Sequence, residues 1–307
     1  MITTESSIAP RRRSNRLRNM ERWHALGFIS PAVIGLSIFT VLPVGLAIVM
    51  SLFDWPIFGT REFIGLGNYV ELLTSSPDFW PALRNSVVFT LLYVPINLIL
   101  ALGLALLLGP RIKGRAVFRV LFFIPVVTPI VANALVWKLI LQPDGLLNGL
   151  STTWFGLTLP NFLVDQNWAM IAVVTMSVWS GLGYNMLVLT AALEQLPASV
   201  LEAAQIDGAR GFRLMTKVVI PLISPSIFFA AVMTIISSLQ VFAQPQLLTG
   251  GGPGTSTIPL VMFIYNTGFK FQDLGLAAAG AWLLFIIIIG ITALQFRAQK
   301  KWVHYEH

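Results

Sequence analysis

The chain has 307 residues, of which 56% are hydrophobic and only 11% are charged, whereas soluble globular proteins carry about 25% charged residues. So much apolar side chain cannot be buried in one aqueous core, and the composition therefore predicts a protein embedded in a lipid bilayer. The net charge of +7 is carried by short basic clusters beside apolar segments, which favours membrane orientation over nucleic-acid binding. The absence of cysteine excludes disulfides, thiolate metal sites and cysteine nucleophiles.

A basic tail at residues 1–23 precedes the apolar part of the chain, which we expect to form one transmembrane domain over 24–300, followed by a tail at 301–307. Pro31 is expected near the start of the first membrane helix and Pro43 at a kink in it. Pro125 and Pro129 are expected to bend the third. The apolar runs predict an all-α membrane protein with six transmembrane helices, at about 26–53, 85–108, 117–141, 168–191, 226–248 and 274–296.

The loops between these spans differ in charge. Sixteen of the twenty Lys and Arg residues lie before the first span, after the last span at 297–307, in the turn at 109–119 and in the loop at 194–225. Positive residues in short loops stay in the cytoplasm, so both termini and this last loop are expected there. The remaining basic residues, on the outer side, are Arg61, Arg84, Lys138 and Lys270. In the first outer loop we expect a short helix near 68–74.

The loop at 194–225 is a polar island between the fourth and fifth spans. Pro197 can start a short helix and Gly208 can end it, after which a second helix over 212–220 is expected to stop at Pro221. A residue at Gly208 is expected to adopt a left-handed conformation or to lie against a partner with no room for a side chain. The pattern predicts a helix-turn-helix outside the lipid.

The spacing within this loop resembles the EAA loop of bacterial ABC-importer permeases. The residues that carry the resemblance are Glu202, Ala203, Ala204, Asp207, Gly208 and Pro221. It implies a type I ABC importer permease fold, in which a cytoplasmic helix-turn-helix coupling loop fits a groove on the ATPase. The alternative is a surface helix pair with ordinary caps.

Motifs for catalysis are missing from the sequence. No phosphate-binding loop is present, because the glycine-rich run at 250–254 lacks the lysine and the following helix. No charged residue lies near the middle of a span, as a proton- or ion-coupled transporter usually requires, and the histidines form no metal site. The chain is therefore expected not to be an enzyme and to hold no cofactor or metal, with ATP and Mg²⁺ bound by a partner ATPase.

A second resemblance begins after the fifth span. The segment LLTGGGP at 247–253, followed by Tyr265, Phe269 and a last span rich in glycine and alanine, is similar to the carbohydrate-uptake branch of these permeases, of the maltose, lactose and glycerol-phosphate type. It implies a bacterial inner-membrane complex with a second permease subunit in a heterodimer, two copies of a cytoplasmic ATPase and an extracytoplasmic solute-binding protein. Contact with the binding protein is expected at Gly250, Gly251, Gly252 and Pro253, although a flexible turn is the alternative.

Polar residues within the fourth and fifth spans are the candidates for the solute pathway, since a polar group in lipid usually faces a partner helix or a wet cavity. They are Tyr184, Asn185, Ser237, Ser238, Gln240 and Gln244. Residues 237, 240 and 244 are expected to share one helix face. The alternative is that these side chains only bond neighbouring helices.

Neutral hydrogen-bonding side chains suit a hydroxyl-rich solute, so the sequence favours a sugar. Glycerol 3-phosphate or a glycerophosphodiester is the alternative, although these two spans hold no arginine or lysine to bind a phosphate. A secondary transporter or a polytopic membrane enzyme is a distant third possibility.

Overall fold

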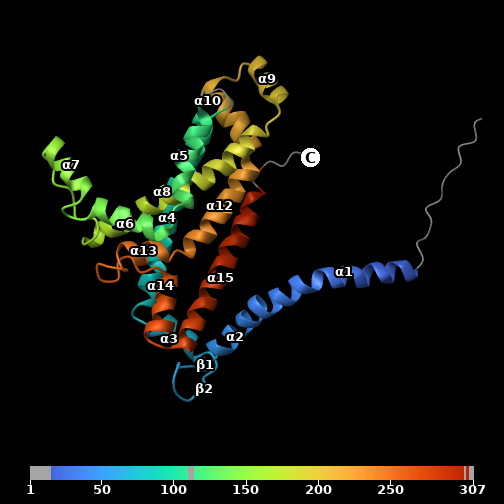
Figure 1. Ribbon diagram of the computed structural model, residues 1–307, viewed down its shortest axis with the longest axis vertical. Helices are drawn as coiled ribbons and strands as arrows, with labels where there is room; N and C mark the ends of the chain where they lie inside the picture. Colours follow the sequence, from blue (N-terminus) through green and yellow to red (C-terminus); the bar gives the residue numbers. More distant parts are fainter. Residues whose placement is uncertain (1–14, 110–113, 301, 304–307) are drawn as a thin grey trace, which may run out of the picture.

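The computed structural model describes residues 15–109, 114–300 and 302–303, and these fold almost entirely into helices (Figure 1). Five helical segments are long and apolar enough to cross a membrane, and a bent helix pair makes a sixth. The prediction of six spans in an all-α membrane protein is thereby confirmed for the described part of the chain. The basic tail at 1–14 and residues 301 and 304–307 lie outside the described residues.

The first span consists of α1 (Asn15–Leu36), one π-helical turn, η1 (Ser37–Val41), and α2 (Leu42–Ser51). The expected irregularity at Pro43 is therefore present, as the π turn just before it. Pro31 lies inside α1 and does not begin it, so that expectation was wrong, because a membrane helix tolerates the single hydrogen bond that a proline removes. In Figure 1, α1 stands away from the bundle, whereas α2 packs on α15 (Leu274–Gln299).

The first loop folds against the start of α15. The expected short helix is α3 (Gly67–Thr74), and the two-residue strands β1 (Phe53–Asp54) and β2 (Glu62–Phe63), which the sequence did not predict, pair antiparallel before it. The backbone N–H of Leu274 donates to the Trp55 carbonyl at 2.9 Å. These contacts fix the loop to one end of the bundle (Figure 1).

The centre of the bundle is the pair α4 (Phe79–Leu107) and α8 (Gln166–Glu194). Two glycines of α8 allow its neighbours to come close, since a Cβ at Gly181 would overlap the Tyr93 hydroxyl of α4 and one at Gly183 would overlap the Phe122 carbonyl of α5 (Arg115–Val127). The helix α4 begins six residues before the expected span. Arg84 consequently lies on a helix rather than in a loop.

The third span is not the single helix expected at 117–141. After α5 the chain is extended at Thr128 and Pro129 and then forms α6 (Ile130–Leu141) and α7 (Leu146–Phe155). A residue that precedes proline is disfavoured in the helical region, so Pro129 produces a break, not only a bend. Pro125 remains inside α5. The segment long enough to cross a membrane is Ile130–Phe155, and α7 was not predicted.

The loop after α8 forms α9 (Ala198–Ile206) and then α10 (Gly211–Leu214), a π turn η2 (Met215–Val219) and α11 (Ile220–Leu222). The helix expected to stop at Pro221 instead runs through it, because the π turn before the proline accommodates the missing N–H. It ends at Ile223, where the chain turns by 69° into α12 (Ser224–Leu239).

The fifth span is shorter than expected. The helix α12 ends at Leu239, and the residues up to 248 form a separate short helix, α13 (Ala243–Leu248). After the glycine-rich segment come α14 (Leu260–Tyr265), a π turn η3 (Asn266–Lys270) and α15.

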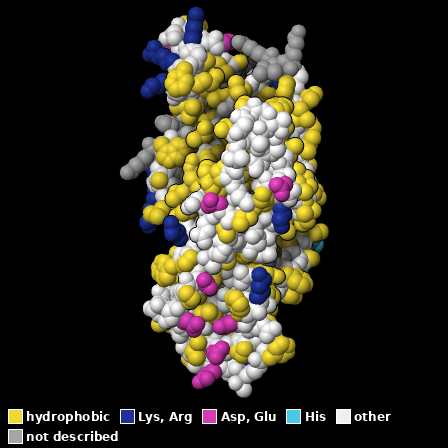
Figure 2. All heavy atoms as spheres, turned by 90° about the vertical axis from the view of Figure 1, so that its left-hand side faces the viewer, with side chains coloured by type: hydrophobic (Ala, Val, Ile, Leu, Met, Phe, Trp, Pro, Cys, Tyr) yellow, Lys and Arg dark blue, Asp and Glu magenta, His cyan; other side chains and the backbone are white. Residues whose placement is uncertain are grey.

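Charged side chains are distributed unevenly along the bundle. On the face shown in Figure 2, a group of Lys and Arg side chains lies at the top, the end that carries α9 and α10. Most Asp and Glu side chains visible there lie in the lower half, and hydrophobic side chains cover much of the surface between.

Candidate solute pathway and coupling loop

Polar side chains from three helices meet inside the bundle at Asn185. Its amide nitrogen donates to Asn97 Oδ1 at 2.6 Å and to Thr234 Oγ1 at 2.9 Å, and only 2% of the residue is exposed. Asn185 therefore ties α8 to α4 and α12. Asn185 thus forms hydrogen bonds between helices, which is the alternative role that the sequence allowed for the polar residues of these spans.

Ser238 is also a packing residue. It is buried, and its hydroxyl lies 3.0 Å from Thr90 Oγ1 on α4 and 2.8 Å from the Ile235 carbonyl. The hydroxyl thus bonds to α4 and to its own helix, α12, and Ser238 lines neither of the two cavities beside Tyr93 and Gly181.

Two cavities lie on either side of Tyr93 and Gly181, which line both of them. One, of 270 Å³, is formed by α4, α8 and α12 and includes Tyr184, Asn185 and Ser237. The other, of 330 Å³, lies toward the start of α8 and is also lined by Asn133, Ser177, Ser180 and Gln244. Because Gly181 has no side chain, the Tyr93 hydroxyl approaches the α8 backbone and separates the two spaces.

The expectation that residues 237, 240 and 244 share one helix face is wrong. The chain leaves helical geometry at Gln240, whose N–H bonds to the Ser237 carbonyl at 3.2 Å, and Gln244 lies on α13. Ser237 and Gln244 consequently line different cavities. Gln240 is exposed and lines neither.

Sequence reasoning missed Tyr93 and Gly181. On α8 a signal was available, since Ser177, Gly181 and Tyr184 recur at i, i+4 and i+7 and so share one face. Tyr93 carried no such signal, because its proximity to α8 depends on how α4 and α8 pack.

The coupling loop (residues 194–225) presents an exposed tip. Glu202, Ala203, Asp207 and Gly208 are exposed and Ala204 partly so, and the structure brings these five together around the end of α9. Gly208 has φ +83°, which confirms the expected left-handed conformation. Pro221 lies apart from them, in α11.

Two large apolar side chains also lie at this tip. Ile206 is 87% exposed and Phe212 is 84% exposed, although the loop surrounds them with polar residues. Exposed apolar groups with a polar rim are typical of protein-contact surfaces.

The root of the coupling loop is held by an ion-pair cluster. Arg115 and Arg119, at the start of α5, lie 3.1 Å and 2.7 Å from the same Glu194 carboxylate oxygen at the end of α8. The tip of the loop thus extends from a fixed base.

The glycine-rich segment at 250–254 lies between α13 and α14 in the lower half of Figure 1. Gly250, Gly251 and Gly254 have positive φ, and the Thr257 hydroxyl donates to the Gly252 carbonyl at 2.9 Å. A Cβ at Gly251 would lie 2.6 Å from Ile258 Cγ1. The segment is consequently an ordered turn, held by its own threonines, with Gly250 and Gly254 exposed.

Residues 97–303, more than half of the chain, match the family model described as binding-protein-dependent transport system inner membrane component. The chain belongs to this family. The lactose transport system permease protein LacF of Rhizobium radiobacter is 32% identical over 89% of this chain and 93% of LacF. The sn-glycerol-3-phosphate transport system permease protein UgpA of Agrobacterium fabrum is 35% identical over 90% of this chain and 94% of UgpA.

The fold has a solved counterpart. The chain superimposes with a TM-score of 0.78 and 22% identity on a chain of a bacterial alginate ABC transporter, crystallised with a periplasmic protein that binds an alginate pentasaccharide. The match covers 94% of this chain and 98% of that one. The type I permease fold is therefore shown, and this family member is a permease subunit of an ABC importer.

Proposed function

We propose that this permease forms part of the solute pathway of an ATP-driven importer for a sugar. The observation that carries the proposal is the pair of cavities that meet at Tyr93 and Gly181, one with a mainly polar wall and one with a mainly apolar wall that carries several polar groups. Hydroxyl, phenol and amide groups line them, and such neutral groups bind a hydroxyl-rich solute through hydrogen bonds. The similarity to LacF supports this solute class.

Glycerol 3-phosphate or a related phosphodiester is the second candidate solute. The similarity to UgpA favours it.

We assign the energy supply to partner chains. The exposed tip of the coupling loop, with Glu202, Gly208, Ile206 and Phe212, is the surface proposed to dock on a cytoplasmic ATPase, present in two copies and supplying ATP and Mg²⁺. The chain itself is then not catalytic. A second permease subunit completes the pore, and an extracytoplasmic binding protein delivers the solute to the glycine-rich segment.

This assignment fixes the orientation in the inner membrane. The basic end of the bundle in Figure 2 faces the cytoplasm, because positive residues are retained on that side. Both termini are then cytoplasmic, and the loop with β1, β2 and α3 lies outside.

The test is uptake by the complete importer reconstituted in liposomes, with ATP enclosed and solute-loaded binding protein added. Gln244→Leu is expected to lower the uptake rate, because the side chain lines a cavity, while Gln240→Leu serves as the matched control and transports normally. Equal rates for wild type and Gln244→Leu would remove the cavity from the pathway. Uptake that proceeds without ATP would reject the importer itself.

A further inference from the structure

A third cavity lies beyond the two at mid-bundle, where α4 and α8 both begin. It has a volume of 570 Å³, within the range of sites for small ligands, and lies between the two helices and the segment that follows the glycine-rich turn. Asn85 closes one side, since its amide donates to the Thr255 carbonyl at 2.7 Å and to the Ile258 carbonyl at 3.0 Å. These two hydrogen bonds hold α4 and the segment at 255–258 together on one side of the cavity.

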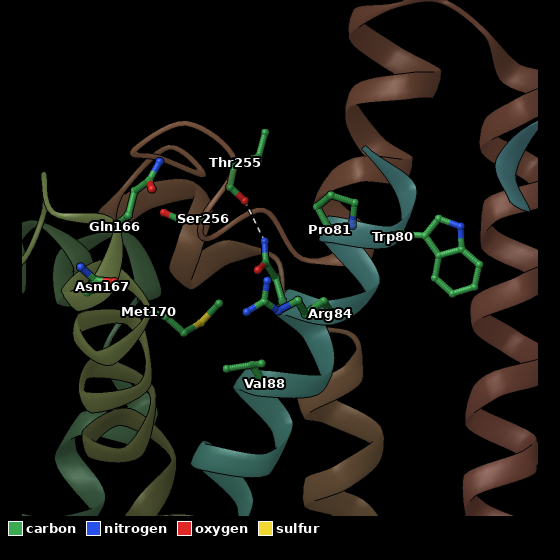
Figure 3. A pocket seen from close by; sticks show the side chains of 10 residues that line it. Trp80, Pro81, Arg84, Val88, Gln166, Asn167, Met170, Thr255 and Ser256 are labelled. Carbon is green, nitrogen blue, oxygen red and sulfur yellow. Dashed lines mark hydrogen bonds between the residues drawn. The ribbon is translucent and has the colours of Figure 1, made fainter. Parts of the chain in front are cut away.

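Among the residues that the structure describes, Arg84 is the only charged one that lines it. Figure 3 shows its side chain reaching from α4 toward Met170 on α8. Within the part of the chain that the structure describes, the guanidinium has no ion pair and no hydrogen bond. The residue is exposed, so its five N–H donors are hydrated and available to an anion that enters the cavity.

The other polar side chains of the lining carry no charge, and one hydroxyl among them is closed off from the cavity. The hydroxyl oxygen of Ser256 is buried, and no hydrogen-bond partner for it exists among residues 15–109, 114–300 and 302–303. The remaining polar side chains of the lining, from Asn85, Gln166, Asn167 and Thr255, are neutral. A single positive charge with several N–H donors and no acidic side chain beside it in the described lining fits an anion with several acceptor oxygens.

The position of the cavity connects it to the solute pathway. On α8, Asn167 and Met170 line the outer cavity, and Ser177, Gly181 and Tyr184 line the two inner ones. Their spacings of 3, 7, 4 and 3 residues place all five on one face of the helix. The three spaces therefore succeed one another along α8.

We propose that this cavity is an outer station of the pathway where Arg84 binds the acidic group of the solute, so that the imported sugar carries a carboxylate, phosphate or sulfonate. The inference rests on the proposed import of sugars and narrows it to acidic ones. The planar guanidinium matches such oxyanions in a bidentate manner. Met170 and Val88 supply the apolar surface for the sugar ring.

The experiment uses the complete importer and its binding protein with solutes in neutral and acidic pairs: lactose and lactobionate, glucose and glucose 6-phosphate, glycerol and glycerol 3-phosphate. We expect an acidic member to be the better substrate. Arg84→Gln should lower uptake of that member by about tenfold at saturating binding protein, and Arg84→Lys should retain part of it. Uptake of any neutral member and the affinity for the binding protein should not change.

Arg61→Gln is the matched control, because Arg61 is also an exposed arginine but lies in the outer loop before α4 and does not line the cavity. Its guanidinium carbon lies 4.1 Å from the ring centroid of Trp55. Preference for neutral solutes would overturn the acidic-sugar inference and leave sugar import intact. If Arg84→Gln lowered the uptake of neutral and acidic solutes equally, the inference would also be overturned, because Arg84 would then bind something other than the solute, such as a lipid phosphate. A weaker affinity of the Arg84→Gln importer for the binding protein would overturn it as well. If no pair member shows ATP-dependent uptake, the proposed function fails as well.

Discussion

Replacement of Gly208 by valine tests whether the coupling loop transmits energy. The φ of +83° is strained for any residue with a Cβ and most strained for a β-branched one. No atom of the described structure lies within 4 Å of a Cβ built at this position, so the substitution causes no clash inside the chain. The whole cost is therefore backbone strain, about 1–3 kcal/mol.

That strain destabilises the loop conformation that is proposed to dock on the ATPase. Since about 1.4 kcal/mol corresponds to a factor of ten in an equilibrium constant, Gly208→Val should weaken association with the ATPase by roughly tenfold or more. Asparagine adopts left-handed geometry far more readily, so Gly208→Asn is expected to be much milder. The permease should still insert, because Gly208 lies outside every helical segment that is long enough to cross a membrane.

The assay is co-purification of ATPase with each permease variant, together with the stimulation of ATP hydrolysis by solute-loaded binding protein. Normal stimulation by a Gly208→Val complex would show that the loop does not couple hydrolysis to transport. If Gly208→Asn were as damaging as Gly208→Val, backbone strain would be the wrong cause, and steric exclusion by the docked ATPase would replace it.

Two further predictions concern the pathway and the orientation. Gly181→Ala should displace the Tyr93 ring and lower uptake, at an overpacking cost of about 1–3 kcal/mol. Gly290→Ala is the control, because this glycine of α15 has open space around it, and equal uptake by both variants would mean that Tyr93 does not separate the cavities. A cysteine at Ser76 should react with an impermeant thiol reagent added outside intact cells and one at Ser199 should not, and the opposite labelling would invert the topology.

Much of the fold could be predicted because a bilayer sets the length and the polarity of every spanning helix. The left-handed conformation of Gly208 was also predictable, because only glycine adopts a left-handed turn at no cost. Local rules failed at proline. Pro221 was expected to stop a helix and Pro129 only to bend one. The geometry of the turn before each proline decides whether the helix continues, and a π turn precedes Pro221 but not Pro129.

The solute pathway was only partly visible in the sequence. Polarity within a span identified Asn185 and Ser238, yet the Asn185 amide nitrogen and the Ser238 hydroxyl both bond to neighbouring helices. Polarity alone does not distinguish a side chain that faces a cavity from one that faces a helix. Tyr93 reaches the pathway through the packing of α4 on α8, a contact between distant segments that no periodicity within either helix encodes.

The sharp turn at Ile223 links the coupling loop to the solute cavities mechanically. A single residue separates α11 from α12, so a displacement of the loop is not absorbed by slack chain but is delivered to α12 as a rotation. With 16 residues, α12 is about 24 Å long, so a tilt of about 10° at Ile223 moves its far end by about 4 Å. Ser237 lies at that far end and lines one of the cavities, so under the proposed docking of the loop on an ATPase a small movement there would change the width of that cavity one helix length away.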